Sequence, residues 1–465
     1  MTTWLHDKTT DFIQRIEEAK AQKAFPFFRP FENIGPQVKV GSGSYLNFMS
    51  NDYLGLSQHP ALIRAAIKGT ERYGTGLGSA RPQATSVRHE ELERRLARWL
   101  GTEACAVFTT GYQALVGVMQ AFLSDDTTLI LDKLSHAAII DGALLAQGSH
   151  PDLEIRFFKH NNVASLAKIL GRTEHQKKLV MAEGLYSVDG DLAPVADMVE
   201  VCREHDAAII LDDAHGLGTL GPTGRGVAEL FGVQREIDMV IGTFSKSFGA
   251  IGGFVCADSN LIDYIKLQAR SFLFSASLPL AQVEAAIAAL DIIENDTWRL
   301  KRLAQNGAFF REGLKDIGID IGKSTTHITP IMIRDELLTL KFGAYLFHGA
   351  DVMMMPFVSP GVSPGQERLR CNVTAAHTRS QMGYTLEALA KIGTMLDVLP
   401  AGTKTSFSNI ERARWLAEQK VRSVRNGGLD YVKQEVGKAV NWTRGHLPFG
   451  NHGPDDATGD THGPS

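Results

Sequence analysis

One lysine, Lys246, lies in the stretch "TFSKSFGAIGG", between two serines and directly after the apolar run 238–244. A lysine at the end of an apolar strand loses hydration of its charged form. Its amine is then easier to deprotonate and becomes a nucleophile toward an aldehyde. The alternative, on these residues alone, is a lysine whose ammonium group extends to solvent. The stretch therefore predicts either a reactive amine or an ordinary surface cation.

Five apolar runs, each followed by a polar turn and a helical pattern, indicate the elements that position this lysine. The runs are 104–108, 128–131, 178–183, 207–212 and 238–244. Such strands, alternating with helices, predict a parallel sheet covered on both faces, which binds ligands at the carboxyl ends of its strands. The groups that follow these ends are Gly111, Tyr112, His136, Ser187, Asp212, His215 and residues 243–246.

These groups suit one cofactor, pyridoxal 5′-phosphate (PLP), which a lysine holds through its aldehyde. PLP also needs an acidic partner for its ring nitrogen, a phosphate cradle and a group against its ring. Asp212 can be the acid, and His136 can lie on the ring, although a lone histidine is usually structural. Backbone N–H groups at a helix start suit a phosphate, and hydroxyls add donors. We expect the cradle from Gly111, Tyr112, Thr243 and Ser245.

Composition excludes several other classes. The chain has 465 residues, with 48 basic and 52 acidic side chains, so its net charge of −4 gives no reason to expect nucleic-acid binding. The four cysteines are widely separated and form no CxxC pair, so we expect neither a metal site nor disulfides. No apolar run is long enough to span a membrane. We therefore expect a cytoplasmic protein.

The fold class that we predict is α/β, with a large domain and a smaller α/β lobe. A chain of this length exceeds one typical core. We divide it into an N-terminal helix and hairpin (1–60), a large PLP-binding domain (61–290), a small C-terminal domain (291–400) and a basic, amphipathic helical extension with a disordered end (401–465). The start of the chain is predicted to form an amphipathic helix.

A glycine pattern at 216–221, "GLGTLG", must be weighed as a dinucleotide site. It matches GxGxxG and follows a strand. The fingerprint requires a helix to open on the pyrophosphate, whereas Pro222 and "TGRG" come next. We therefore do not expect a nicotinamide or flavin cofactor.

Seven motifs in order give a specific resemblance. They are "SNDYLGL", "FTTGYQA", "SHAAIIDG", "EGLYSVDGDLAPV", "LDDAHGLGTLGPTGRG", "GTFSKSFGAIGG" and "RLRCNVTAAHT". Together they resemble the α-oxoamine synthases, fold-type-I PLP enzymes, over residues 35–400. The appearance is closest to the serine palmitoyltransferase branch.

The resemblance implies a role for each matching residue. Lys246 matches the lysine that carries the cofactor, and His215 a histidine near the cofactor O3′ and the substrate carbonyl. Ser187 matches a serine near O3′, and Ser275 a position that reaches the phosphate of the neighbouring subunit, which implies a homodimer with shared active sites. The resemblance implies the same roles as above for the acidic partner of the ring nitrogen, Asp212, and for the residue against the ring, His136. It also implies a phosphate cradle from Gly111, Tyr112, Thr243 and Ser245. Substrate binding is implied for Arg370, which grips the amino-acid carboxylate, and for Asn51.

The activity implied is a decarboxylating condensation of a small amino acid with an acyl thioester. Our first expectation is L-serine with a long-chain acyl-CoA, as in sphingolipid biosynthesis, with Met353–Met355 in an apolar run that either lines an acyl channel or packs in the core. The alternative is glycine or alanine with a shorter acyl-CoA, of the glycine C-acetyltransferase or 8-amino-7-oxononanoate synthase type. An aminotransferase-like protein or a non-catalytic partner subunit also stays open.

Two regions depart from the family pattern. "QATSVRHEELE" stands where relatives commonly have a glycine-containing turn near the substrate, so the choice of amino acid is open. The extension after residue 401 lies outside the shared pattern. Its basic helical segments suggest contact with an anionic membrane surface or an acyl carrier protein, or simply packing on the subunit itself.

Overall fold

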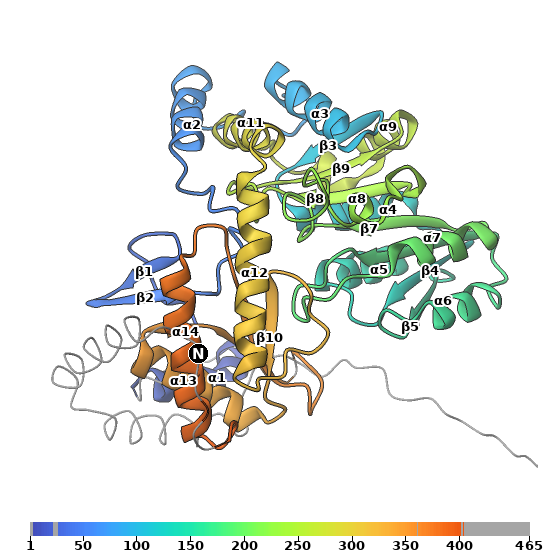
Figure 1. Ribbon diagram of the computed structural model, residues 1–465. Helices are drawn as coiled ribbons and strands as arrows, with labels where there is room; N and C mark the ends of the chain where they lie inside the picture. The colour runs from blue at the N-terminus through green and yellow to red at the C-terminus, as the bar shows by residue number, and fades with distance from the viewer. Residues whose placement is uncertain (1–2, 22–26, 360, 401–402, 404–465) are drawn as a thin grey trace, which may run out of the picture.

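The computed structural model describes residues 3–21, 27–359, 361–400 and 403 (Figure 1). The predicted extension at 401–465, with its proposed membrane or carrier-protein contact, therefore lies outside the described residues, apart from residue 403. In the described part, a large lobe carries a seven-stranded sheet, and a smaller lobe carries two three-stranded sheets. The domain boundaries given above stay a prediction.

The central sheet has the strand order β3-β9-β8-β7-β6-β4-β5. All five predicted strands are present, and two were missed: β5, a half-exposed edge strand, and β9, which follows a glycine-rich turn. Neighbouring strands run parallel from β8 to β5, whereas β9 is antiparallel to both its neighbours. The strands are β3 (Ala104–Phe108), β4 (Thr127–Asp132), β5 (Glu154–Phe158), β6 (Lys177–Glu183), β7 (Ala208–Asp212), β8 (Met239–Thr243) and β9 (Gly253–Ala257).

Helices cover both faces of this sheet because its strands are apolar on both sides. Along β7, Ile209 and Leu211 face one hydrophobic cluster, and Ile210 faces another. The first cluster includes residues of α3 (Val87–Leu100), α7 (Val195–Glu204) and α11 (Leu280–Asn295), and the second includes α4 (Gly111–Phe122), α5 (Ala137–Ser149) and α9 (Ser259–Gln268). The remaining helices of this lobe are α6 (Val163–Leu170), α8 (Val227–Phe231), the 3-10 turn η1 (Gln234–Glu236) and α10 (Arg270–Leu273).

The smaller lobe follows a long helix, α12 (Trp298–Asp316), and has a core of its own. One sheet is antiparallel, with β10 (Ile328–Met332), β13 (Arg368–Asn372) and β12 (Met355–Phe357); the other joins β1 (Gln37–Val40), β2 (Gly43–Asn47) and β11 (Val352–Met353). Helices α13 (Glu336–Ala350) and α14 (Arg379–Met395) pack against each other. The methionine run is thus divided between two sheets, and Met353 and Met354 are buried.

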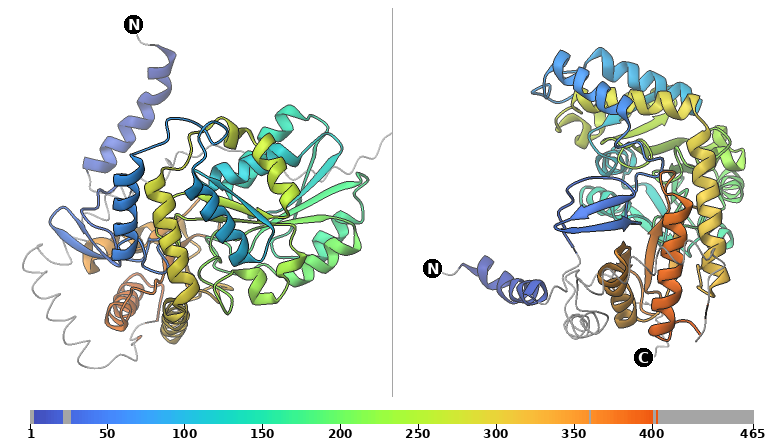
Figure 2. Two further views of the ribbon diagram at one scale, coloured as in Figure 1. Left: turned by 90° about the horizontal axis from the view of Figure 1, so that it is seen from above. Right: turned by 60° about the vertical axis from the view of Figure 1, so that its left-hand side comes forward.

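The N-terminal segment contains two helices. The predicted amphipathic helix, α1 (Trp4–Ala21), extends away from the body (Figure 2), and Trp4, Leu5 and Ile13 are exposed on it. Helix α2 (Pro60–Tyr73) packs against α11 so closely that a Cβ on Gly69 would lie 3.1 Å from a backbone oxygen.

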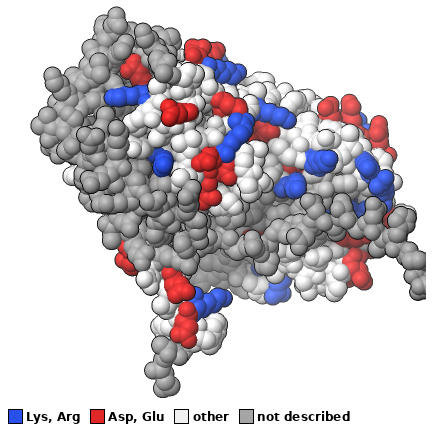
Figure 3. Space-filling model, turned by 90° about the horizontal axis from the view of Figure 1, so that it is seen from below, with Lys and Arg blue, Asp and Glu red and all other residues white. Residues whose placement is uncertain are grey.

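The charged surface matches the balanced composition. On the face in Figure 3, Lys and Arg side chains are interspersed with Asp and Glu among the described residues. No helix in this described part has the length and apolar character needed to cross a membrane. Within the same residues, His, Cys, Asp and Glu form no group of three or more suited to a metal ion.

Candidate active site

The parallel strands bring chemically active groups to one edge of the sheet. Glu183, the last residue of β6, pairs in register with Asp212, the last residue of β7, and β8 ends beside them at Thr243. The start of α4 lies against β8, because a Cβ on Gly111 would stand only 3.3 Å from the Cβ of Thr243. The predicted strand-end groups are therefore gathered in one region.

Lys246 lies in a turn that buried aromatic rings hold in place. Phe244 and Phe248 on either side have no exposed surface, and their ring centroids are 5.4 Å apart. The backbone N–H of Phe244 donates to the carbonyl of Gly252, which closes the loop. Lys246 itself is partly exposed, as access by a substrate requires. Its desolvation nevertheless lowers its pKa to about 8, against the opposing effects of Asp212 and Glu183.

Two buried carboxyl groups lie beside this lysine. Asp212 is 5% exposed and Glu183 is 3% exposed. Burial raises the pKa of Asp212, while the nearby amine of Lys246 opposes that shift. Burial and the neighbouring Asp212 raise the pKa of Glu183 well above its usual range. The two carboxyl groups are neighbours on adjacent strands, and Lys246 opposes the pKa shift at each of them.

The ring of His136 is fixed at the start of α5. Its Nδ1 accepts a hydrogen bond of 3.1 Å from the backbone N–H of Ala138, so the proton of the neutral ring lies on Nε2. Desolvation lowers the pKa of His136, while Asp212 opposes the shift. The residue still keeps an exposed surface. A neutral, fixed and accessible ring suits stacking against a flat cofactor.

The start of α4 provides the surroundings that a phosphate requires. Thr110 caps the helix by accepting from the N–H of Gln113 at 3.1 Å, while the N–H groups of Gly111 and Tyr112 belong to the same first turn. The hydroxyl of Tyr112 donates to Asp141 at 2.9 Å.

Hydroxyl groups lie beside this helix start. Thr243 Oγ1 lies 2.8 Å from Ser245 Oγ, and Ser245 is exposed. Ser275 Oγ accepts from Gln113 Nε2 at 2.8 Å, so in this chain Ser275 lies at the start of α4. Its predicted contact with a neighbouring subunit stays a prediction. N–H groups at a helix start, with hydroxyls beside them, fit the phosphate of PLP, just as Lys246 fits its aldehyde and Asp212 its ring nitrogen.

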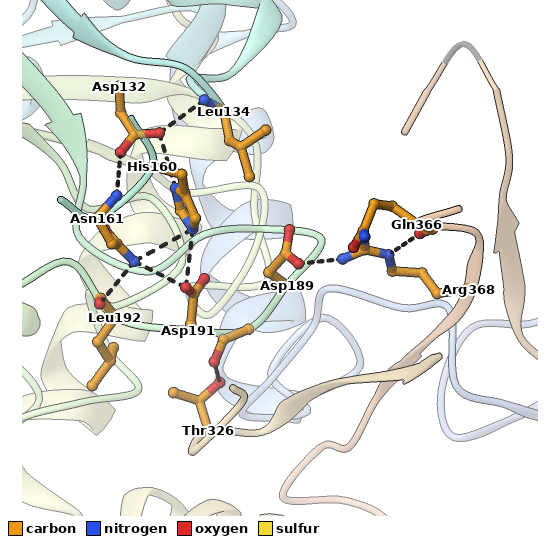
Figure 4. Close-up of polar contacts among 11 residues, drawn as sticks. Asp132, Leu134, His160, Asn161, Asp189, Asp191, Leu192, Thr326, Gln366 and Arg368 are labelled. Carbon is orange, nitrogen blue, oxygen red and sulfur yellow. Dashed lines mark hydrogen bonds and ion pairs between the residues drawn. The ribbon is translucent and has the colours of Figure 1, made fainter. Parts of the chain in front are cut away.

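Ser187 lies in the turn 187–189. Charged groups join this turn and the residues after it to both lobes, as the contacts of Asp189 and Asp191 in Figure 4 show. His160 bridges two carboxylates, with Nδ1 2.9 Å from Asp132 and Nε2 3.0 Å from Asp191. Burial alone would lower the pKa of His160, but these two partners raise it to about 10, so the ring is a cation. From the small lobe, Arg368 pairs with Asp189 in the same turn.

The small lobe and the N-terminal segment supply Arg370 and Asn51. Arg370, on β13, donates through Nη2 to Asn51 Oδ1 and through Nε to Asn372 Oδ1 at 3.1 Å. Arg370 is half-buried, and its charge contributes to lowering the pKa of both Lys246 and His215. The predicted substrate-binding residues thus contact each other and lie within electrostatic reach of the lysine.

His215 follows β7 and faces the N-terminal segment. Its Nδ1 lies 2.7 Å from the hydroxyl of Tyr53, and both residues are buried. Burial, with help from Lys246 and Arg370, lowers the pKa of His215 well below its usual range, so the ring is neutral. Sequence reasoning missed Tyr53 and Glu183. Their signals were present, because Tyr53 belongs to "SNDYLGL" and Glu183 ends an apolar strand run.

Comparison with known proteins gives consistent relatives. Residues 44–389 match the family model "Aminotransferase class I and II". The 8-amino-7-oxononanoate synthase of Geobacter metallireducens is 39% identical over 393 residues, covering 83% of this chain and 99% of that protein. The enzyme of the same name from Thermoanaerobacter pseudethanolicus is 36% identical over 400 residues, covering 85% of this chain and 99% of the relative.

Solved structures agree on the fold. Serine palmitoyltransferase from S. paucimobilis superimposes with a TM-score of 0.80 at 31% identity, over 85% of this chain and all of that one. The 8-amino-7-oxononanoate synthase of Francisella tularensis gives 0.65 at 25% identity, over 75% of this chain and 97% of that one. The predicted family, fold class and PLP cofactor are thereby confirmed. The chain belongs to the aminotransferase class I and II family and, within it, to the PLP-dependent α-oxoamine synthases.

Proposed function

We propose that the protein condenses L-alanine with a seven-carbon acyl thioester that ends in a carboxylate, as an 8-amino-7-oxononanoate synthase would. A nine-carbon 8-amino-7-oxo acid contains seven acyl carbons and two carbons of alanine after its carboxyl group leaves as CO2. The support is the identity of 35–39% with curated relatives of that name, over nearly their full length. This function is of the 8-amino-7-oxononanoate synthase type that the sequence left as the alternative, and it replaces serine and sphingolipid biosynthesis as the leading proposal.

The observation that carries the chemistry is the partly desolvated amine of Lys246 beside the buried carboxylate of Asp212. When bound, PLP supplies a cationic ring that accepts the electron pair left at the amino-acid Cα. Asp212 keeps that ring cationic, and the ring of His136 orients it. In this proposal the phosphate is held by Gly111, Tyr112, Thr243 and Ser245, while Ser275 reaches the phosphate of the neighbouring subunit. Ser187 lies at the O3′ side.

Other residues orient the amino acid and transfer its protons. Arg370 pairs with the alanine carboxylate, with Asn51 and Asn372 holding its guanidinium. Lys246, once its amine is free, removes the Cα proton. Cα then forms a bond to the thioester carbon, the C–S bond breaks, and the thiol leaves. Loss of CO2 and return of a proton to Cα give the α-amino ketone, while His215 donates to the oxygen that becomes negative.

Lys246→Ala tests the chemistry. We expect no detectable condensation and no PLP covalently fixed by borohydride, measured by thiol release and by mass spectrometry of the reduced protein. Lys323→Ala, which removes an exposed lysine, is the matched control and should behave as the unaltered protein. Full turnover by Lys246→Ala would overturn the assignment.

A panel of substrates tests the specificity. Alanine, glycine and serine are each combined with seven-carbon dicarboxylic, acetyl and palmitoyl thioesters of coenzyme A, and thiol release is followed. The proposal expects alanine with the seven-carbon donor to give the largest kcat/KM. The higher TM-score with serine palmitoyltransferase favours a second candidate, serine with a long-chain donor, and a preference for that pair would select it. Amino-group transfer from an amino acid alone would instead indicate an aminotransferase.

The homodimer with shared sites stays a prediction. Its support is the likeness of Ser275 to the family position that reaches across the interface. Analytical ultracentrifugation of the purified chain measures the assembly directly, and a monomer with full activity would contradict it.

A further inference from the structure

Tyr53 lies between two predicted site residues, His215 after β7 and Asn51 in the N-terminal segment. It lies in the N-terminal segment, has no exposed surface, and places its hydroxyl 2.7 Å from His215 Nδ1 and 3.1 Å from Asn51 Oδ1. A phenol hydroxyl has one proton, so it can donate to only one of these acceptors at a time. The choice fixes which nitrogen of His215 carries its proton.

Asn51 Oδ1 already receives two donors. Arg370 Nη2 donates to it, and Asn372 Nδ2 donates to it at 3.0 Å. Arginine has no acceptor atom, so the oxygen of Asn51, and not its NH2 group, must face Arg370. Two donors use both lone pairs of this amide oxygen. The proton of Tyr53 is therefore better placed on the shorter contact, toward His215 Nδ1.

The protonation states support this direction. Burial raises the pKa of Tyr53, so the phenol keeps its proton. The imidazole of His215 is neutral, for the reasons given above, and its Nδ1 has a lone pair available. Among the described residues, the Tyr53 hydroxyl has only these two side-chain hydrogen-bond partners, and its contact with His327 is a T-shaped ring contact with centroids 4.3 Å apart.

We propose that Tyr53 is a positioning residue that holds His215 as a neutral imidazole with its proton on Nε2, so that His215 acts as a hydrogen-bond donor and not as a base. This inference rests on the proposed function, because it assigns how His215 serves that reaction. A donor of this kind stabilises a developing oxygen anion without gaining or losing a proton. Proton removal at Cα is then left to Lys246. Asn51, whose Oδ1 lies 3.1 Å from the same hydroxyl, instead accepts from Arg370, the residue proposed to hold the amino-acid carboxylate.

Nitrogen NMR of the PLP-loaded enzyme, labelled with ¹⁵N-histidine and free of amino acid, tests the tautomer. The His215 signals are those that disappear in His215→Asn. We expect one protonated nitrogen, Nε2, and one unprotonated nitrogen, Nδ1, with well separated shifts. Tyr53→Phe removes the donor to Nδ1, so the two shifts should move toward each other as both tautomers are populated. A proton on Nδ1 in the unaltered protein, or unchanged shifts in Tyr53→Phe, would overturn the proposal.

Steady-state kinetics provide the second measurement. Tyr53→Phe should lower kcat by about 10- to 100-fold, below the full loss of an oxyanion donor, while KM for the amino acid stays nearly constant. The matched control is Tyr384→Phe, which removes a hydroxyl that donates to the carbonyl of Ala350 in the small lobe; it should change neither kcat nor the His215 signals. An unchanged kcat in Tyr53→Phe contradicts the proposal. Absence of condensation with every thioester would instead refute the proposed function, while the NMR signals still decide the role of Tyr53.

Discussion

The residues proposed to hold the cofactor (the cofactor side) and those proposed to bind the amino acid (the substrate side) are arranged in different ways. On the cofactor side, Asp212, Thr243 and Lys246 come from neighbouring strand ends of one sheet. On the substrate side, Arg370 and Asn51 are 319 positions apart in the chain and meet through hydrogen bonds. The first arrangement follows from sheet topology, while the second depends on how the small lobe and the N-terminal segment fold together.

The two sides also differ in electrostatics. The cofactor side combines buried carboxyl groups with one amine, so the charge of each group shifts the pKa of its neighbours. The substrate side combines one arginine with neutral amides, which orient the guanidinium without neutralising it. A cofactor-side change should therefore act mainly on kcat, and a substrate-side change mainly on KM for the amino acid.

The largest effect should come from Asp212→Asn. An amide cannot keep the ring nitrogen of PLP protonated by charge, so we expect kcat to fall by about 10³-fold, the upper range for one preorganised electrostatic partner. PLP should remain bound, as measured by its absorbance after gel filtration.

The adjacent carboxyl group is the control for Asp212. Asp213 accepts from the N–H of Val227 at 2.7 Å and serves the fold. Burial raises its pKa to about 7. Asp213→Asn should leave kcat nearly intact, with a cost in stability. If both substitutions lowered kcat equally, charge at Asp212 would not be the cause.

Arg370→Lys should give the next largest effect. Lysine cannot present two parallel N–H donors, and the loss of one charge-assisted hydrogen bond, about 1.5–3 kcal/mol, should raise KM for the amino acid about 10- to 100-fold. Initial rates over a range of amino-acid concentrations measure it. Arg368→Lys, two residues earlier on β13, should leave KM nearly unchanged because Arg368 faces Asp189. A fall in kcat alone would erase the distinction between the two sides.

The sequence predicted the arrangement of these two sides to different extents. The proximity of Asp212 and Lys246 was predicted, because parallel strands place their carboxyl ends together and the apolar runs 207–212 and 238–244 end at or beside these residues. The contacts of Arg370 with Asn51 and of Tyr53 with His215 could not be predicted by that rule. They depend on hydrogen bonds between distant segments, which periodicity does not encode, and only the resemblance pointed to Arg370 and Asn51.

A third prediction concerns His160, the cation that joins Asp132 at the end of β4 to Asp191 beside the Ser187 turn. The pKa of His160, raised to about 10, exceeds the value near 6.5 of an unfolded histidine, so its stabilising effect is complete below pH 6.5 and is lost as the pH rises toward 10. His160→Gln should lower the free energy of unfolding by about 2 kcal/mol at pH 6, as for one charged hydrogen-bonded group, and by less at pH 9. Urea unfolding at both pH values measures it. An equal loss at both values would mean that His160 is not charged in the folded protein.

The smallest effect should come from the contact between the two lobes at the same turn. Thr326 Oγ1, in the small lobe, donates to the carbonyl of Gly190 at 2.9 Å (Figure 4). Thr326→Val keeps the shape and removes this bond, so we expect a loss of about 1 kcal/mol in the free energy of unfolding, with KM and kcat little changed. Thr403→Val, which removes an exposed hydroxyl bond to Pro400, is the control and should cost less. A clear rise in KM for the amino acid would show that this contact also positions β13, and the substrate side would then extend across both lobes.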